Sequence, residues 1–371
     1  MKEGWTYKCL VEVCDVYQPQ TIASKDLLSD GQYLVYGANG VIGKYNKYNH
    51  EESEVLLTCR GATCGNINIS APYSWINGNA MVVHPKSNNL TKPFIVFLLK
   101  TLDYSVVITG AAQPQITRAS LSKISIPVPP LAEQERIVAY LDTQFAKIDA
   151  MKANAAKALA EAKALFQAAL TEAMTPKEGW NINKLDDVCN FRSGFAFKSN
   201  KFTEEGEAII RISDIQCGKV DETNMVFFHL SDYSEDLQRF IVYPNDILIA
   251  MSGGTTGKIG INKTNKKFYL NQRVGVFRED KRLLDHSYLF YYLNTKSQES
   301  LKIAAGAAQP NLSTEQIKNF EVPLPPLPEQ ECIVTRLDAL SAKVAALEGN
   351  YTQTVAECDA LKQALLREVF E

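Results

Sequence analysis

The sequence predicts an α+β fold in which two mixed α/β domains are separated by an antiparallel pair of long helices that form a coiled coil. Residues 111–150 recur at 307–346 without a gap, at an offset of 196. The segment Lys2–Trp5 returns as Lys177–Trp180, at an offset of 175. Both copies of the longer repeat continue with helical periodicity. A repeat of this length indicates one structural unit used twice, so we predict an internal pseudo-twofold symmetry.

The repeats divide the chain into four predicted segments. We place the first α/β domain at 1–126, the first helix at 127–175, the second domain at 176–322 and the second helix at 323–371. Because the two offsets differ by 21 residues, the second domain is the longer one.

The two domains share a faint sequence skeleton. Residues 57–69 and 249–261 each consist of an apolar run, a Gly/Thr turn and alternating isoleucines, a pattern typical of two strands joined by a tight turn. We predict one helix near 93–102, where Pro93 suits a first turn, and another near 286–296. The domains are therefore expected to share a fold while their turns differ.

The helical segments follow prolines at 127–130 and 323–328, which exclude a helix up to about residue 131 or 328. From Ile333 to Leu365 apolar residues recur at alternating spacings of four and three, which predicts a heptad seam. The equivalent positions of the first copy are rich in alanine. Helix one is expected to end near Thr175, directly before the second domain. If the seams face each other, the helices must therefore run antiparallel.

Composition indicates a globular protein without membrane association. The chain has 371 residues, 46% hydrophobic and 22% charged, with a net charge of −3. It has no apolar run of the roughly 18 residues that span a membrane, and its first residues lack the apolar core of a signal peptide. The eight cysteines form no C-x-x-C pair, which argues against a zinc site or a disulfide framework. We predict a cytoplasmic protein with reduced thiols.

Catalytic motifs are not found in the sequence. The segment Gly253–Ile259 is one residue too short for a phosphate-binding loop and has isoleucine where serine or threonine is needed. The Gly37–Gly43 segment lacks the dinucleotide spacing. The four histidines lie far apart in the sequence. We therefore predict no catalytic residue, no metal site and no cofactor site in this chain.

Polar side chains on glycine-rich turns are the candidate functional residues. Arginine pairs with guanine and asparagine or glutamine with adenine in the major groove, and threonine or serine contacts either base or phosphate. A basic strip within residues 258–282, with eight basic groups against Glu279 and Asp280, suits phosphate contact. Ordinary turn chemistry and a solvated surface remain alternatives. The candidate DNA contacts are Arg60, Thr63, Asn66 and Asn68 in the first domain and Ser252, Thr255, Thr256, Lys258, Lys263, Asn271, Gln272 and Arg273 in the second.

The whole chain resembles the DNA-specificity subunit of type I restriction–modification systems. The motif A-Q-P…P-x-P-P-L-x-E-Q-E-x-I-V-x-x-L-D occurs at 112–142 and again at 308–338. The segments 36–43 and 210–215 and the tryptophans at positions 5 and 180 are also similar to that family.

The resemblance implies two target-recognition domains, each recognising half of a gapped double-stranded DNA sequence. It implies that the helix pair sets the spacing and docks modification (methyltransferase) subunits and, through them, restriction/translocase subunits. Those partners would hold S-adenosylmethionine, ATP and Mg²⁺. We therefore expect a sequence-specific DNA-binding subunit without enzymatic activity of its own. The alternatives are a protein-interaction scaffold with two variable domains on a helical spacer, or a stand-alone enzyme.

Overall fold

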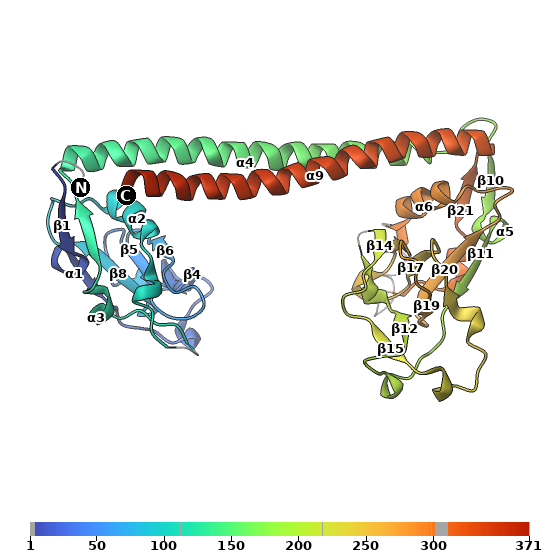
Figure 1. Cartoon of the computed structure of the whole chain (residues 1–371), viewed down its shortest axis with the longest axis horizontal. Coiled ribbons are helices and arrows are strands. Elements are labelled where there is room, and N and C mark those ends of the chain that lie inside the picture. Colours follow the sequence, from blue (N-terminus) through green and yellow to red (C-terminus); the bar gives the residue numbers. More distant parts are fainter. Residues whose placement is uncertain (1–3, 111–112, 217, 298, 301–310, 371) are drawn as a thin grey trace. The chain divides into compact units, whose positions relative to one another are not determined.

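The computed structural model describes residues 4–110, 113–216, 218–297, 299–300 and 311–370 (Figure 1). The chain divides into two compact units. Unit 1 contains the residues up to Lys157 together with those from Asn350 onward, and unit 2 contains Ala158–Gly349. Each unit thus holds one α/β domain and parts of both long helices, α4 (Leu131–Ala173) and α9 (Leu327–Phe370).

Unit 1 is built on a four-stranded sheet with the order β2-β8-β5-β6, beside a three-stranded sheet β4-β3-β7 and a two-stranded ribbon β1-β9. The helix α2 and the sheet bury a common apolar core. The elements are β1 (Thr6–Cys9), α1 (Leu10–Val13), β2 (Cys14–Tyr17), β3 (Tyr33–Gly37), β4 (Gly40–Tyr45), β5 (Val55–Thr58), β6 (Ile67–Ile69), β7 (Trp75–Ile76), β8 (Ala80–Pro85), α2 (Lys92–Thr101), α3 (Arg118–Leu121) and β9 (Ser125–Val128).

Unit 2 repeats this plan in larger form. Its main sheet has the order β11-β20-β17-β18-β14-β13, its second sheet is β15-β12-β19-β16, and its ribbon is β10-β21. The elements are β10 (Asn181–Lys184), α5 (Leu185–Val188), β11 (Cys189–Ser193), β12 (Glu207–Ile210), β13 (Ile215–Gln216), β14 (Gly218–Val220), β15 (Val226–Phe228), β16 (Ile241–Val242), β17 (Ile247–Ala250), β18 (Ile259–Ile261), β19 (Phe268–Leu270), β20 (Val274–Glu279), α6 (His286–Thr295), α8 (Thr314–Lys318) and β21 (Glu321–Leu324).

The two units share one topology, as the repeats predict. The strand order β2-β8-β5-β6 of unit 1 matches β11-β20-β17-β18 of unit 2, and the parallel pair β3·β7 matches β12·β19. The predicted strand–turn–strand pairs are confirmed as β5·β6 and β17·β18, both antiparallel. The extra length of the second domain forms β13, β14 and β16, which lie in sequence between β12 and β17.

The predicted short helices are confirmed as α2 and α6. Each begins at a side chain that accepts a hydrogen bond from the backbone three residues on, Thr91 from Phe94 and Asp285 from Tyr288. Such caps satisfy an N–H group that would otherwise have no partner in the helix.

A repeated glutamine fastens each long helix to its domain. Gln134 is fully buried; its Oε1 accepts from the N–H of Thr91 (2.9 Å), and its Nε2 donates to the carbonyls of Asn89 (2.8 Å) and Pro129 (2.9 Å). Gln330 makes the same three contacts in unit 2, with the N–H of Asp285 (2.8 Å) and two carbonyls (2.9 Å each). The glutamine of the Pro-Pro-Leu-x-Glu-Gln motif therefore joins the start of a long helix to the cap of the domain helix.

The long helices pair antiparallel within each unit (Figure 1). In unit 1, Ile137 and Leu141 of α4 share a core with Leu366 and Phe370 of α9. Lys152 pairs with Asp359 (2.8 Å) there, and Lys163 with Glu348 (2.5 Å) in unit 2. Because positions 152 and 359 are equivalent to 348 and 163 at the offset of 196, the second ion pair is the first with its charges exchanged. This is the pairing expected of a pseudo-twofold.

The structure refines two details of the helix prediction. The second helix begins at Leu327, because Pro328 occupies its first turn, where proline is tolerated. The heptad seam is also not continuously buried: Leu347 and Leu361 remain 38% and 46% exposed.

Candidate nucleic-acid interface

In each unit, three turns and the beginning of the repeated segment meet at one end of the main sheet. We call this surface the loop end. In unit 1 it comprises residues 37–40, 59–66, 77–80 and 113–116. In unit 2 it comprises residues 211–214, 251–258, 271–274 and 311–312.

The β5–β6 turn and the β17–β18 turn have the same backbone hydrogen bonds. In unit 1 the N–H groups of Thr58, Cys64, Gly65 and Asn66 donate to the carbonyls of Asn66, Gly61, Thr58 and Thr63, and in unit 2 those of Ala250, Thr256, Gly257 and Lys258 donate to Lys258, Gly253, Ala250 and Thr255. Both turns have positive φ at the same two glycines, 89° and 99° in the first and 73° and 81° in the second, a conformation that favours glycine. The glycines therefore fix the turn and leave the other side chains variable.

The β7–β8 and β19–β20 turns also match. Each is a four-residue turn closed by an N–H···O bond of 2.9 Å, from Ala80 to Asn77 and from Val274 to Asn271. The carbonyl of the third residue accepts from the neighbouring turn, Asn79 from Cys59 (3.3 Å) and Arg273 from Met251 (2.9 Å). The same backbone hydrogen bond thus holds the two turns against each other in both units; in unit 1 the Cys59 thiol also donates to the carbonyls of Gly78 (3.6 Å) and Asn79 (3.3 Å).

The repeated segment closes the loop end. Ile116 donates its N–H to Cys59 (3.0 Å), and Leu312 donates to Met251 (2.8 Å). Arg60 forms an isolated bridge with Gln115, and Ser252 does so with Asn311. The constant part of the chain therefore supports the variable turns directly.

Most of the candidate residues gather at the loop ends, in differing degrees of exposure. Thr256 is buried and its hydroxyl donates to the carbonyl of Gly253 (2.7 Å), so it serves the turn itself. The exposed candidates there are Arg60, Asn66, Lys258, Gln272 and Arg273, and the half-buried ones are Thr63, Ser252, Thr255 and Asn271. Asn68 lies beyond the turn, in β6, is half-buried and donates to the carbonyl of Ala38 (3.4 Å).

Lys263 lies elsewhere. It follows β18, whereas the β17–β18 turn precedes that strand, so Lys263 is at the opposite end of the main sheet. The predicted basic strip is divided in the same way. Arg278, Arg282 and Lys266 form ion pairs with Asp246, Asp280 and Glu222. Only Lys258 and Arg273 of the strip reach the loop end, because β18 and β20 carry the chain away from it.

Three further loop-end residues were not among the candidates: Asn39, Asn79 and Arg211. Asn39 and Asn79 are exposed, and Arg211 is half-buried. Asn39 and Arg211 lie in the segments 36–43 and 210–215, which the structure brings to equivalent places: Asn77 donates to Tyr36 (2.9 Å) as Asn271 does to Ile210 (3.1 Å). The two segments were the only sequence signal for these residues. Their position beside the other turns depends on the parallel pairs β3·β7 and β12·β19, which the sequence does not reveal.

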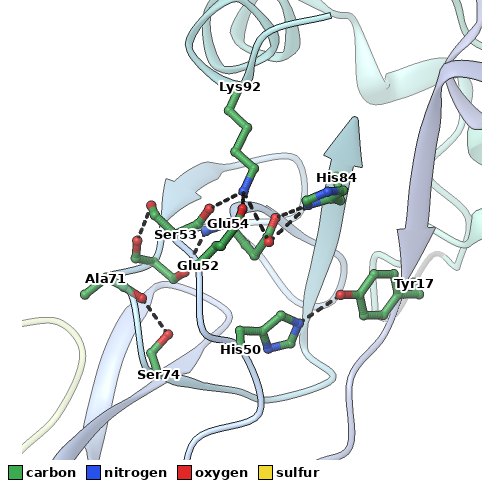
Figure 2. A network of polar contacts seen from close by, with 10 residues as sticks. Tyr17, His50, Glu52, Ser53, Glu54, Ala71, Ser74, His84 and Lys92 are labelled. Carbon is green, nitrogen blue, oxygen red and sulfur yellow. Dashed lines mark hydrogen bonds and ion pairs between the residues drawn. The ribbon is translucent and has the colours of Figure 1, made fainter. Parts of the chain in front are cut away.

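A cluster of titratable groups lies at the other end of the unit 1 sheet (Figure 2). Glu54, 5% exposed, accepts from His84 (2.9 Å) and Lys92 (3.3 Å), and Tyr17 contacts His50 at 2.9 Å. Burial raises the pKa of the Tyr17 hydroxyl and lowers the pKa of His50. The histidines, distant in sequence, are thus neighbours in the fold.

The position of this cluster indicates a structural role. Glu54 directly precedes β5 and His84 lies in β8; at the equivalent places of unit 2, Asp246 precedes β17 and Arg278 lies in β20. Arg278 contacts Asp246 at 2.7 Å. An arginine cannot act as a base at ordinary pH, so what both units share is a contact between a carboxylate that precedes one strand and a nitrogen-bearing side chain of the neighbouring strand.

Over the part of the chain that the structure describes, no group of three or more His, Cys, Asp or Glu side chains could hold a metal ion. The described cysteines are free thiols. Among the described helices, none is long and apolar enough to cross a membrane.

Comparison with known proteins gives one consistent result. The family model described as "Type I restriction modification DNA specificity domain" matches residues 2–160 and 177–356. The chain is 27% identical over 354 residues to the type I restriction enzyme MjaVIII specificity subunit of Methanocaldococcus jannaschii, covering 87% of this chain and 82% of the relative. It is 28% identical over 378 residues to the EcoKI specificity subunit of Escherichia coli, covering 96% and 76%.

Solved structures share the fold. A chain from a study of type I R-M complex assembly and conformational transition superimposes with a TM-score of 0.77 at 21% identity, covering 100% of this chain and 98% of that one. The HsdS subunit of Thermoanaerobacter tengcongensis gives a TM-score of 0.59 at 21% identity, covering 100% and 97%. Since the family model matches both α/β domains and most of both long helices, the chain belongs to the family of type I restriction–modification DNA specificity subunits.

Proposed function

We propose that this chain is the sequence-specific double-stranded DNA-binding subunit of a type I restriction–modification complex, and that each loop end recognises one half of a bipartite, gapped target. As a specificity subunit the chain is the non-catalytic component. The observation that carries the proposal is the loop end itself. One backbone hydrogen-bond framework occurs twice, and the exposed side chains on it differ between the units. A framework that holds variable polar side chains suits direct recognition of base edges.

The long helices are proposed to dock the modification subunits. Met151 and Leu361 are 55% and 46% exposed in unit 1, and the equivalent residues of unit 2, Leu347 and Leu165, are 38% and 71% exposed. Apolar side chains left exposed at equivalent positions of both units suit two copies of one partner. Restriction/translocase subunits would join through those partners.

Cofactors would lie on the partner subunits. We propose that methyl transfer with S-adenosylmethionine and ATP- and Mg²⁺-dependent translocation belong to them. The proposed assembly acts on DNA, and the cysteines in the described part of the chain are free thiols. Both points support a cytoplasmic location.

An exchange of one domain tests the proposal. Residues 1–110 are replaced by the corresponding domain of another specificity subunit, and the sites methylated by the assembled complex are mapped by sequencing. The expected result is a change in one half of the target with the other half and the gap retained. A change in both halves, or in neither, contradicts the proposal. A complex without sequence-dependent DNA affinity would instead favour the scaffold alternative.

Partner docking has its own test. Met151→Glu and Leu347→Glu each place a charge on one of the two equivalent apolar positions. Each substitution should weaken binding of one of two modification subunits, measured as the mass of the assembled complex. Thr143→Glu, at an exposed polar position of α4, is the control. If both variants assemble with the same mass and affinity as the control, the docking surface is elsewhere.

A further inference from the structure

We infer that the third residue of the β7–β8 and β19–β20 turns determines base preference, with Arg273 selecting guanine in one half of the target and Asn79 selecting adenine in the other. This inference rests on the proposed function and adds to it the residue and the base of one contact in each half. Asn79 and Arg273 occupy equivalent backbone positions, but their side chains differ in hydrogen-bonding chemistry.

The backbone at this position is fixed in the same way in both units. The turn is closed by a 2.9 Å bond, from Ala80 to Asn77 or from Val274 to Asn271, and the third residue's own carbonyl is held by Cys59 or Met251. The side chain of that residue is exposed in both units. A fixed Cα with an exposed side chain defines where the side chain starts and lets its chemistry decide the partner.

Arg273 is oriented by the constant segment. Its Nη1 donates to Oδ1 of Asn311 at 3.1 Å, and Asn311 is itself bridged to Ser252. The guanidinium has five N–H donors in a planar fork, so one contact to Asn311 leaves donors for a second partner. Two parallel donors match O6 and N7 of guanine, which makes arginine–guanine the commonest specific pairing in the major groove.

Asn79 offers different chemistry from the same place. A carboxamide presents one donor and one acceptor side by side, which match N7 and the N6 amino group of adenine. The position of Asn311 is taken by Gln115 in unit 1, bridged to Arg60 as Asn311 is to Ser252.

The surrounding residues differ in the same direction. Lys258 stands where unit 1 has Asn66, and Arg211 stands where unit 1 has Gly37, although Arg60 replaces Ser252 in the opposite sense. Arg211 lies 3.6 Å from Asp214, so the loop end of unit 2 has three basic residues and one acidic residue, against one basic residue in unit 1. Guanine presents two acceptors in the major groove, whereas adenine presents an acceptor and a donor. The more cationic loop end thus suits the more electronegative base edge.

Reciprocal substitutions in the full complex test the inference. The chain is assembled with its modification subunits and incubated with duplexes in which each half-site is randomised in turn; bound duplexes are then sequenced. Arg273→Asn should lower the guanine preference at one position of one half-site by about 5- to 150-fold, the range of a bidentate base contact. Asn79→Arg should lower an adenine preference in the other half-site. Each substitution should leave the opposite half-site unchanged.

A matched control separates this role from general electrostatics. Lys281→Asn removes a positive charge from the exposed residue beyond the far end of β20 and should leave base preference as it is. Asn311→Ala should weaken the guanine preference of the same position while the melting temperature stays unchanged, because Asn311 acts as a positioning residue through Arg273. Asn311→Asp, which retains the acceptor, should restore it.

The outcomes are distinct. Suppose that the complex without substitutions selects a bipartite sequence and that Arg273→Asn weakens binding to all sequences equally. Arg273 then contacts phosphate, and the inference is wrong while the proposed function stands. The inference also fails if the preference that changes is for a base other than guanine. If the complex without substitutions selects no sequence at all, both the inference and the proposed function fail.

Discussion

Replacing the buried glutamine of the repeated motif should destabilise the unit in which it lies. Gln134→Leu removes three hydrogen bonds, of which the one to Pro129 is buried and the ones to Thr91 and Asn89 are partly buried. At about 1 kcal/mol for each hydrogen bond, the loss is about 3 kcal/mol. With a melting-temperature shift of roughly 2–4 °C per kcal/mol for a unit of this size, unfolding should occur about 6–12 °C lower.

Thermal and urea unfolding of the full chain, followed by circular dichroism, measures the effect. Gln167→Leu is the matched control, because Gln167 lies exposed on the same helix and its replacement should change stability by less than about 0.5 kcal/mol. Gln134→Glu tests the reasoning further: the carboxylate keeps an acceptor for Thr91 but has no N–H for the two carbonyls, so it should be no more stable than the leucine variant. If Gln134→Leu unfolds at the same temperature and urea concentration as the control, the view that this side chain joins the helix to the domain is refuted.

Three further results are expected. Burial lowers the pKa of His50, so the folded state favours the neutral imidazole; the resulting stability is fully present above the ordinary pKa of 6.5 and is lost as pH falls through the lower folded-state pKa. His50→Asn should therefore make stability decline less steeply below pH 6.5, and an unchanged pH profile would count against this. Burial raises the pKa of the Cys14 and Cys189 thiols to about 12, so both should resist alkylation at pH 8 in the native chain while the exposed Cys332 reacts, as peptide mass mapping will show. Gly257→Ala should cost about 1–3 kcal/mol in a urea titration, because φ is +81° there and an added Cβ would lie 2.8 Å from the Ser297 carbonyl oxygen; a neutral substitution would mean that the turn can relax.

The order of domains and helices could be predicted because the sequence contains two internal repeats. Two offsets give the order of domains and helices, prolines mark where the helices begin, and the glycines of 57–69 and 249–261 mark turns that the structure confirms. These signals are local or compare the chain with itself, so they need no knowledge of tertiary packing.

The composition of the loop end could be predicted only in part. Lys263 was grouped with Lys258 because they are close in sequence, yet β18 separates them. The sequence does not place Asn39 and Arg211 at the loop end, because the pairs β3·β7 and β12·β19 are parallel and join residues 40 and 60 positions apart, Val35 with Trp75 and Ile209 with Tyr269. The role of Gln134 could not be predicted either, since its partners Thr91 and Asn89 lie 43 and 45 residues away in the sequence.

The hydrogen bonds of the loop end suggest how one duplicated unit can acquire two specificities. The hydrogen bonds that recur in both units at the matching turn positions use backbone N–H and carbonyl groups, which every residue but proline supplies. Replacement of Asn79 by another residue, as Arg273 replaces it in unit 2, therefore costs the framework little. The glycines at positions 61 and 65 and their equivalents are different, because their positive φ excludes most side chains. At the exposed polar positions, in contrast, a substitution can change the base edge that is bound and leave the fold intact.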